Sequence, residues 1–181
     1  MIIKKTAPKS KTNKPYVKHI LYFSFIAGGI LQVLACEIYR NTIIDWWVAP
    51  SVWLVTGIIA QRFLADVLST SAAASNYFLQ LFHCLMSFGG PASYLFLATN
   101  YYIDRGSPSE LVKVAIQRTG HLATGLHECG NPYTMVTIHN ADKQLIFPCD
   151  LDISRYRYVI VNTKKGLLGY DCITDKRLIE E

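Results

Sequence analysis

Charged residues are missing from three long stretches within the first 103 residues of the 181-residue chain. No Asp, Glu, Lys or Arg occurs at residues 19–36, 46–61 or 67–103. A helix on the surface of a soluble domain needs a polar side that faces water, and these stretches cannot provide one. A wholly soluble protein is therefore excluded. Intrinsic disorder is excluded as well, because disordered chains are polar and highly charged whereas 51% of these residues are hydrophobic.

Sequence motifs of catalysis are also lacking. The chain contains no GxSxG or HExxH motif, no glycine-rich phosphate loop and no pair of carboxylates inside the apolar stretches. Asp150 and Asp152 are close enough to suggest an acidic pair, but we interpret them as turn residues. The sequence therefore predicts a protein that is not an enzyme and that needs no cofactor.

The apolar stretches predict three transmembrane helices within a transmembrane region at residues 19–103. Their expected bounds are about 20–38, 46–64 and 77–101. A helix of about 19 residues spans roughly 28 Å, which is close to the thickness of the hydrocarbon core of a bilayer. Trp46 and Trp47 suit the membrane–water interface, where tryptophan is enriched. Pro91 is expected to kink the third helix.

Basic residues gather at the N-terminus. Residues 1–18 form a basic N-terminal arm that holds six lysines and no acidic residue, and this arm accounts for the formal net charge of +5. A nucleic-acid-binding surface would interleave basic and aromatic residues on a folded domain, so no nucleic-acid partner is expected. Tyr156 and Tyr158 do alternate with Arg155 and Arg157, and we interpret that pattern as the packing of a strand.

The arm also indicates how the chain is oriented. Cytoplasmic flanks of membrane helices are rich in Lys and Arg, so we expect a cytoplasmic N-terminus that lies near the lipid bilayer and its anionic head groups. Three spans would place the C-terminal part on the opposite side. A re-entrant second stretch would return it to the cytoplasm, and the distribution of basic residues favours that arrangement, so the side stays open.

Small residues and one histidine interrupt the apolar stretches. Gly28 and Gly29 in the first stretch, and Gly89 and Ser93 in the third, would let neighbouring helices approach closely. His83 lies inside the third stretch, and ionisable residues within a membrane are functional candidates. It serves either as a hydrogen-bonding contact between helices or as part of a proton relay.

The C-terminal part changes pattern after a linker at Asp104–Pro108. Residues 107–181 alternate apolar and polar side chains with the period of half-buried strands. The five expected strands cover about residues 112–116, 133–138, 143–147, 156–162 and 167–173. Their expected inward side chains are Val112, Val114, Ile116, Val136, Ile138, Leu145, Phe147, Val159, Val161, Leu168 and Ile173. The sequence thus predicts an α+β membrane protein in which three transmembrane helices precede a small five-stranded β barrel or sandwich.

Three motifs in this part are GNPY at 130–133, KQLIFPC at 143–149 and KKGLLGYD at 164–171. With them the chain resembles, over most of its length, small bacterial three-span membrane proteins that have a C-terminal β tail and no assigned activity. The resemblance implies this architecture and a bacterial inner-membrane location. The layout alone is also similar to NfeD-type membrane proteins, whose helices are followed by an OB-like domain.

The C-terminal part also contains histidines and cysteines that could bind soft or borderline metals. These side chains are His121, His127, Cys129, His139, Cys149 and Cys172. Structural zinc sites use paired spacings such as CxxC, which are missing, so we predict no metal site and keep the first five only as candidate ligands. Cys129 and Cys149 are a candidate disulfide if this part faces an oxidising compartment, and are free thiols otherwise.

These observations favour a non-enzymatic multi-pass membrane protein that presents a small β domain to a protein partner or to another copy of the chain. One alternative is a membrane-bound metal- or redox-responsive sensor or enzyme that uses the histidines and cysteines of the C-terminal part. Another is an oligomeric transport component, because three spans in one chain are too few to line a pore.

Overall fold

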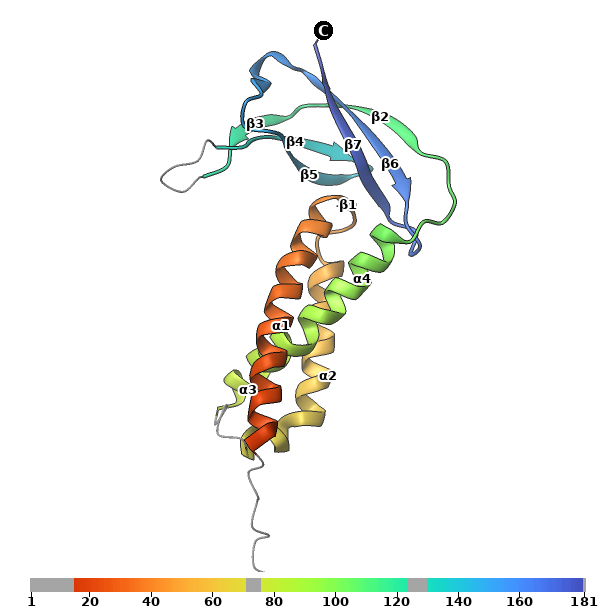
Figure 1. Cartoon of the computed structure of the whole chain (residues 1–181). Helices are drawn as coiled ribbons and strands as arrows, with labels where there is room; N and C mark the ends of the chain where they lie inside the picture. Colours follow the sequence, from red (N-terminus) through yellow and green to blue (C-terminus); the bar gives the residue numbers. More distant parts are fainter. Residues whose placement is uncertain (1–14, 71–75, 124–129, 181) are drawn as a thin grey trace, which may run out of the picture.

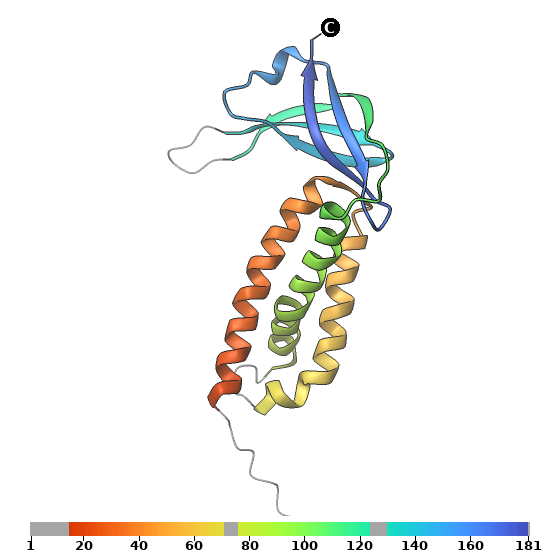
Figure 2. The same cartoon turned by 45° about the vertical axis from the view of Figure 1, so that its right-hand side comes forward.

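The structure is a computed structural model that describes residues 15–70, 76–123 and 130–180. A bundle of three long helices carries a β domain at one end, and together they form an elongated molecule (Figure 1). The chain enters the bundle at the end remote from the β domain and finishes at the top of that domain (Figure 2).

Three helices form the bundle, and each is long and apolar enough to cross a membrane. The first, α1, covers Pro15–Arg40, and the second, α2, covers Val48–Thr70. The third consists of α3 (Tyr77–Cys84), a π-helical turn η1 (Leu85–Gly89) and α4 (Gly90–Tyr102). All three predicted helices are confirmed. The first extends beyond both of its predicted ends, whereas the second begins two residues later and ends six residues later than predicted.

The predicted irregularity of the third helix is a π-helical turn. Pro91 is the second residue after this turn, in the first turn of α4. Proline has no N–H to donate to the preceding turn, and its ring crowds the carbonyl four residues earlier, so regular α-helical hydrogen bonding cannot continue through it. A π-helical turn is one way in which a helix accommodates such an interruption.

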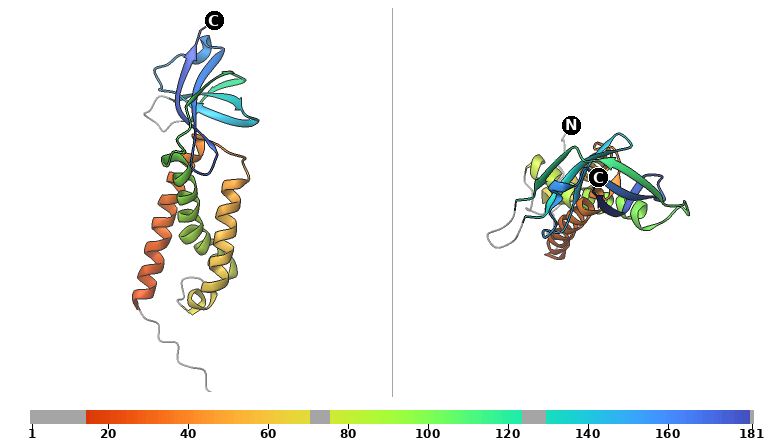
Figure 3. Two further views of the ribbon diagram at one scale, coloured as in Figure 1. Left: turned by 90° about the vertical axis from the view of Figure 1, so that its right-hand side faces the viewer. Right: turned by 90° about the horizontal axis from the view of Figure 1, so that it is seen from above.

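The β domain contains two antiparallel sheets (Figure 3). One sheet has the strand order β1-β7-β6-β2 and the other has the order β3-β4-β5. The strands of the first sheet are β1 (Thr42–Ile43), β2 (Glu110–Ala115), β6 (Tyr158–Lys165) and β7 (Asp171–Ile179). Those of the second are β3 (Arg118–His121), β4 (Pro132–Ile138) and β5 (Ala141–Ile146).

The predicted count of five strands is wrong. Among the described residues there are seven, because β3 is a separate strand after β2 and β1 comes from the connection between the first two helices. The last strand also begins later than predicted. Residues 167–169 form a turn, in which Gly169 has a positive φ of 91°, and β7 then continues to Ile179.

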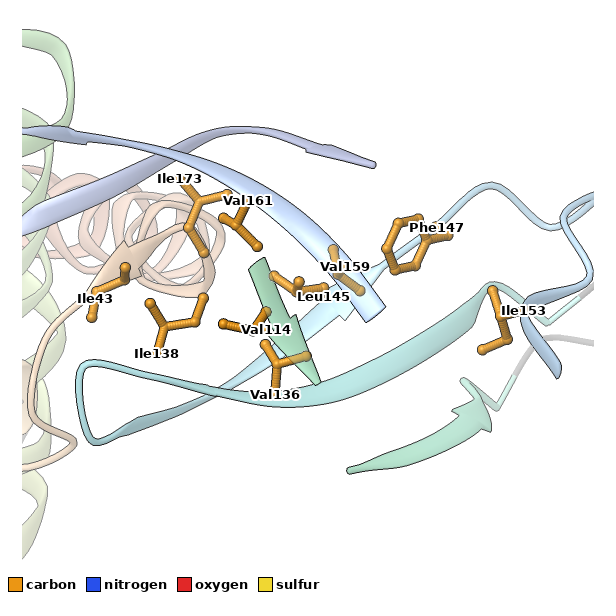
Figure 4. Packing of buried hydrophobic residues seen from close by; sticks show 10 residues of the cluster. All are labelled: Ile43, Val114, Val136, Ile138, Leu145, Phe147, Ile153, Val159, Val161 and Ile173. Carbon is orange, nitrogen blue, oxygen red and sulfur yellow. The ribbon is translucent and has the colours of Figure 1, made fainter. Parts of the chain in front are cut away.

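The hydrophobic core of the β domain lies between the two sheets (Figure 4). Eight of the predicted inward side chains are buried in it: Val114, Val136, Ile138, Leu145, Phe147, Val159, Val161 and Ile173. Val112 and Ile116 are partly buried against the same cluster. Leu168 is 43% exposed, so its predicted inward position is wrong. Ile43 and Ile153, which were not predicted, complete the cluster.

Candidate functional site

Glycines allow the helices to approach one another closely at the π-helical turn. A Cβ atom on Gly28 would overlap the carbonyl of Met86, and one on Gly90 would overlap the carbonyl of Gly28. A Cβ on Gly89 would lie 2.7 Å from the backbone oxygen of Trp53. The predicted role of Gly28 and Gly89 in helix packing therefore has a direct geometric basis.

The remaining predicted packing residues behave differently. A Cβ on Gly29 would contact only the end of the Met86 side chain, at 3.4 Å, so this position has room for a larger residue. Ser93 is 2% exposed, and its hydroxyl has no hydrogen-bond partner among the described residues. Ser93 is thus a small residue inside the bundle.

His83 faces a small space between α1 and α3. Its ring stacks on Phe25 at a centroid distance of 5.3 Å and lies beside a cavity of about 170 Å³, which is otherwise lined by aliphatic and aromatic residues. Its Nε2 atom is buried and has no hydrogen-bond partner among the described residues. Tyr22 is the other lining residue with an ionisable side chain among the described residues, and no carboxylate or second histidine lines the cavity there.

A buried amide at the end of α4 attaches the β domain to the helices. Asn100 is fully buried, and its Nδ2 donates hydrogen bonds to the carbonyl of Tyr170 at 3.1 Å and to the sulfur of Cys172 at 3.2 Å. Its Oδ1 accepts a hydrogen bond from the backbone N–H of Leu168 at 3.1 Å. This one side chain thus fixes the turn between β6 and β7.

The expected linker also takes part in this attachment. Asp104 forms an isolated β-bridge with Gly166 and an ion pair with Lys164. The hydrogen bond from Lys164 holds the pKa of the Asp104 carboxyl below its usual range. The segment after α4 is therefore docked on the β domain at its start and does not act as a free hinge there.

A second attachment joins β5 to the end of α1. The side chain of Lys143 is 4% exposed, and its Nζ donates a hydrogen bond to the carbonyl of Tyr39 at 3.3 Å. The same ammonium group lies 4.3 Å from the centre of the Tyr39 ring. Burial lowers the pKa of Lys143 to about 8. The cation thus caps the C-terminal end of α1, where the helix carbonyls favour positive charge.

The two described histidines of the candidate metal set, His121 and His139, lie far apart. His121 ends β3 opposite Pro132 at the start of β4, whereas His139 follows the end of β4. Seven strand residues between them span about 20 Å, so the two cannot share a metal ion. His139 lies 3.3 Å from Asp171. No group of three or more metal-binding side chains occurs among the described residues, and His127 and Cys129 lie outside them.

The described cysteines are either free or disulfide-bonded. Cys149 is disulfide-bonded, and its predicted partner, Cys129, lies outside the described residues. Cys36, Cys84 and Cys172 are free thiols. Cys172 is buried at the junction with α4, and this burial raises the pKa of its thiol. It is therefore a neutral hydrogen-bonding group of the junction.

A basic and aromatic hollow of about 400 Å³ lies where the chain passes from one sheet to the other. We call it the distal hollow, and its lining residues are Ala115, Ile116, Gln117, Arg118, Thr119, Tyr156, Arg157 and Tyr158. Two backbone hydrogen bonds join the segments that line it. The N–H of Ile116 donates to the carbonyl of Arg157, and the N–H of Gln117 donates to the carbonyl of Met135, each at 2.9 Å.

The distal hollow is at the end of the β domain remote from the helices. Tyr158 pairs with Ile179 at the end of β7, whereas the start of β7 pairs with β1 beside the bundle. Arg118 and Arg157 are exposed, and neither forms an ion pair with another described residue. Lys113 lies 4.2 Å from the centre of the Tyr158 ring and adds a third cation nearby. The hollow is thus suited to bind negative charge.

Comparison with protein-family models, with curated proteins and with solved structures finds no match for this chain. The features described above therefore carry the functional argument alone.

Two functional features went beyond the sequence analysis. Arg118 lines one hollow with Tyr156, Arg157 and Tyr158, and the Tyr–Arg alternation at 155–158 alone does not indicate that Arg118 lies there. Asn100 was not singled out, although a lone amide before two tyrosines at the end of an apolar stretch was a usable signal. Such a group must find hydrogen bonds if it is buried.

Proposed function

We propose that this protein is a multi-pass membrane protein and a non-enzymatic interaction module. Its helices hold the β domain at one membrane surface, and the distal hollow binds a segment of a partner protein that carries carboxylates. The single observation that carries this proposal is a pair of exposed arginines, Arg118 and Arg157, that have no ion-pair partner among the described residues and lie beside two tyrosines.

Membrane insertion is supported by the outer surface of the bundle. Large apolar side chains are exposed along all three helices, including Phe23 at 75%, Phe63 at 81%, Phe78 at 76% and Leu95 at 63%. Water would not tolerate so much contiguous apolar surface on a monomer, whereas lipid chains would cover it without cost.

The orientation follows from two features at opposite ends. The lysine-rich residues 1–18 favour a cytoplasmic N-terminus, and three crossings then place the β domain on the other side. The disulfide at Cys149 fits that side, because disulfides persist in oxidising compartments. In a bacterium, this would be the outer face of the inner membrane.

The chemistry of the hollow favours a carboxylate-bearing protein segment. Guanidinium groups bind carboxylates through two parallel hydrogen bonds, and tyrosines supply contact area at protein interfaces. A domain attached to the bundle at both Asn100 and Lys143 offers this surface in a fixed orientation, which reduces the entropic cost of binding. The partner would thus be recognised at a distance from the membrane.

Charge reversal tests the proposal. The full-length protein is isolated from its native membranes in mild detergent after crosslinking, and its co-purifying proteins are compared with those of the Arg118→Glu/Arg157→Glu variant. The matched control is Arg177→Glu, because Arg177 is an exposed arginine outside the hollow that pairs with Asp175 at 3.0 Å. We expect one partner to be lost in the hollow variant alone. An unchanged set of partners, or none in the wild type, would contradict the proposal.

Elemental analysis of the same preparation separates this function from the alternative of a metal-responsive sensor or enzyme. Stoichiometric zinc or copper would favour the sensor. The oligomeric state of the purified protein likewise tests the transport alternative, because a pore would require several chains.

A further inference from the structure

The turn between β6 and β7 presents two leucines beside the bundle. Leu167 and Leu168 are 41% and 43% exposed, at the tip of a turn that extends from Gly166 to Tyr170. The turn projects from the β domain toward the bundle and reaches the ends of the helices (Figures 2 and 3). Its leucines therefore lie at the boundary between the domain and the apolar surface of the bundle.

Contacts with the third helix set the depth of this turn. The backbone N–H of Leu167 donates to the carbonyl of Ile103 at 2.9 Å, just beyond α4. The ring of Tyr170 lies 6.1 Å from the ring of Phe96, which is six residues before the end of α4. Six helical residues correspond to about 9 Å along the axis. The turn thus overlaps the final part of the third helix.

Other side chains at this end of the bundle have the composition of a membrane interface. Trp46 is 79% exposed and Trp47 is 54% exposed, directly before α2, and Tyr102 is 69% exposed at the end of α4. Tryptophan and tyrosine gather where lipid chains meet head groups. The backbone N–H of Leu167 binds the carbonyl of Ile103, the residue that follows Tyr102, so the turn lies close to an aromatic residue of this kind.

Positive charge flanks the turn on the side of the β domain. Lys165 is exposed immediately before it, and Arg105 is exposed and lies against Gly169, where its Nη1 is 3.4 Å from the position of a Cβ. Lys164 is already paired with Asp104. Lys165 and Arg105 are thus placed to contact the phosphates of anionic lipids.

We propose that the β6–β7 turn is a membrane-binding element, in which Leu167 and Leu168 insert among the outermost lipid chains while Lys165 and Arg105 bind anionic head groups. Hydrogen bonds within the turn, from Gly169 to Gly166 and from Gly166 to Tyr170 at 2.9 Å each, hold its shape. Because the turn already has this shape, its insertion into lipid carries a small cost in conformational entropy. This inference rests on the proposed membrane insertion of the helices, and it assigns lipid contact to a part of the β domain.

Spin labels on the full-length protein in phosphatidylglycerol vesicles test the inference. Cys36→Ser removes an exposed thiol, and this background without an added cysteine measures labelling at the remaining positions. Labels are then placed by Leu168→Cys, by Leu95→Cys on the exposed face of α4, and by Leu111→Cys, which is 70% exposed on β2. The measurement is the accessibility of each label to oxygen, which concentrates in lipid, relative to a water-soluble nickel chelate.

We expect position 168 to favour oxygen, at a depth between positions 95 and 111. If position 168 matches position 111 while position 95 lies in lipid, the turn does not insert, although the helices do. If position 95 is also in water, the proposed membrane insertion itself is wrong. Arg105→Glu/Lys165→Glu should make position 168 shallower, as should vesicles of phosphatidylcholine. An unchanged depth in both cases would overturn the binding of anionic lipid.

Discussion

Lys143 is a buried cation in a chain whose other buried side chains are neutral or apolar in the described parts. Alternation along β5 already places residue 143 on the same face as the predicted inward residues Leu145 and Phe147. What the sequence could not provide is the partner, because the carbonyl and ring of Tyr39 come from a helix 104 positions earlier. The position of this lysine was thus open to prediction, and its function as a cap was not.

Replacing Lys143 by methionine should stabilise the β domain at neutral pH. Since the folded state lowers the pKa from 10.5 to about 8, charging this lysine in the folded state costs about 3 kcal/mol. Loss of the hydrogen bond and of the Tyr39 contact offsets roughly 2 kcal/mol of this gain. The expected result is a Tm at pH 7 that is a few degrees higher.

The pH dependence gives the same prediction a second readout. Between pH 8 and 10.5 the unfolded state binds more protons than the folded state, so the contribution of Lys143 makes wild-type stability rise with pH. Thermal melts in detergent at pH 7.5 and 10 should show this rise in the wild type and a smaller one in Lys143→Met. Lys165→Met is the control, because Lys165 is exposed. A wild-type slope that survives in Lys143→Met would show that other groups cause it.

At the scale of the elements, the helices follow from composition, and their close contact depends on single glycines. Long apolar stretches predicted all three helices, and Gly28 and Gly89 were predicted as packing residues. Gly57 and Gly90 were not, although a Cβ on Gly57 would overlap Leu85 and one on Gly90 would overlap Gly28. Small residues are common in membrane helices, so the sequence alone does not identify which of them face a neighbour.

The adjacent glycines of α1 provide a matched pair of variants. Gly28→Val should strongly destabilise the bundle, by about 3 kcal/mol or more, because the added atoms would meet the backbone of Met86, which cannot move aside easily. Gly29→Val should have a small effect, because its neighbour is the flexible end of the Met86 side chain. Thermal unfolding of both proteins in one detergent measures the difference. Equal losses of stability would mean that the two helices do not cross at Gly28.

The strands show where local pattern fails. Alternation predicted the parts of β2, β4, β5 and β6 that form the core. β1 has only two residues, too few for any periodic signal, and it exists because Thr42 and Ile43 pair with Cys172 and Asp171. The LLGYD sequence has the composition of a strand, but Gly169 has a positive φ and Asn100 binds the backbone on either side of it. Contacts with distant parts of the chain therefore determine both that β1 is a strand and that residues 167–169 form a turn.

For the whole molecule, the predicted independence of residues 107–181 is open to a direct test. Their core includes Ile43, which is 7% exposed and comes from outside this range. Burial of one such side chain contributes about 1.5–3 kcal/mol, and each kcal/mol shifts the Tm of a small domain by about 4–8 °C. We therefore expect the isolated fragment to show dispersed amide NMR signals but to melt about 6–24 °C below the β domain of the full chain.

Ile43→Ala in the full-length protein separates the contribution of this residue from that of the helices. Ile43→Ala should lower the Tm of the β domain by part of the difference seen in the fragment. Ile26→Ala, at a 61% exposed position on α1, should leave the Tm of the β domain unchanged. A fragment that melts as high as the intact β domain would show that β1 is dispensable. A fragment without dispersed signals would show that the domain folds only on the bundle.

The pairing of β1 with β7 also has a consequence for synthesis. Ile43 and Asp171 are neighbours in the sheet, but they leave the ribosome far apart in time. Protein synthesis adds about 5–20 residues per second, so β7 is made roughly 6–25 s after β1. During that interval α2 and the third helix are synthesised, while the strand with which β1 will pair does not yet exist. Closure of this sheet is thus a late event in biogenesis, and a nascent chain halted before residue 171 would expose Ile43.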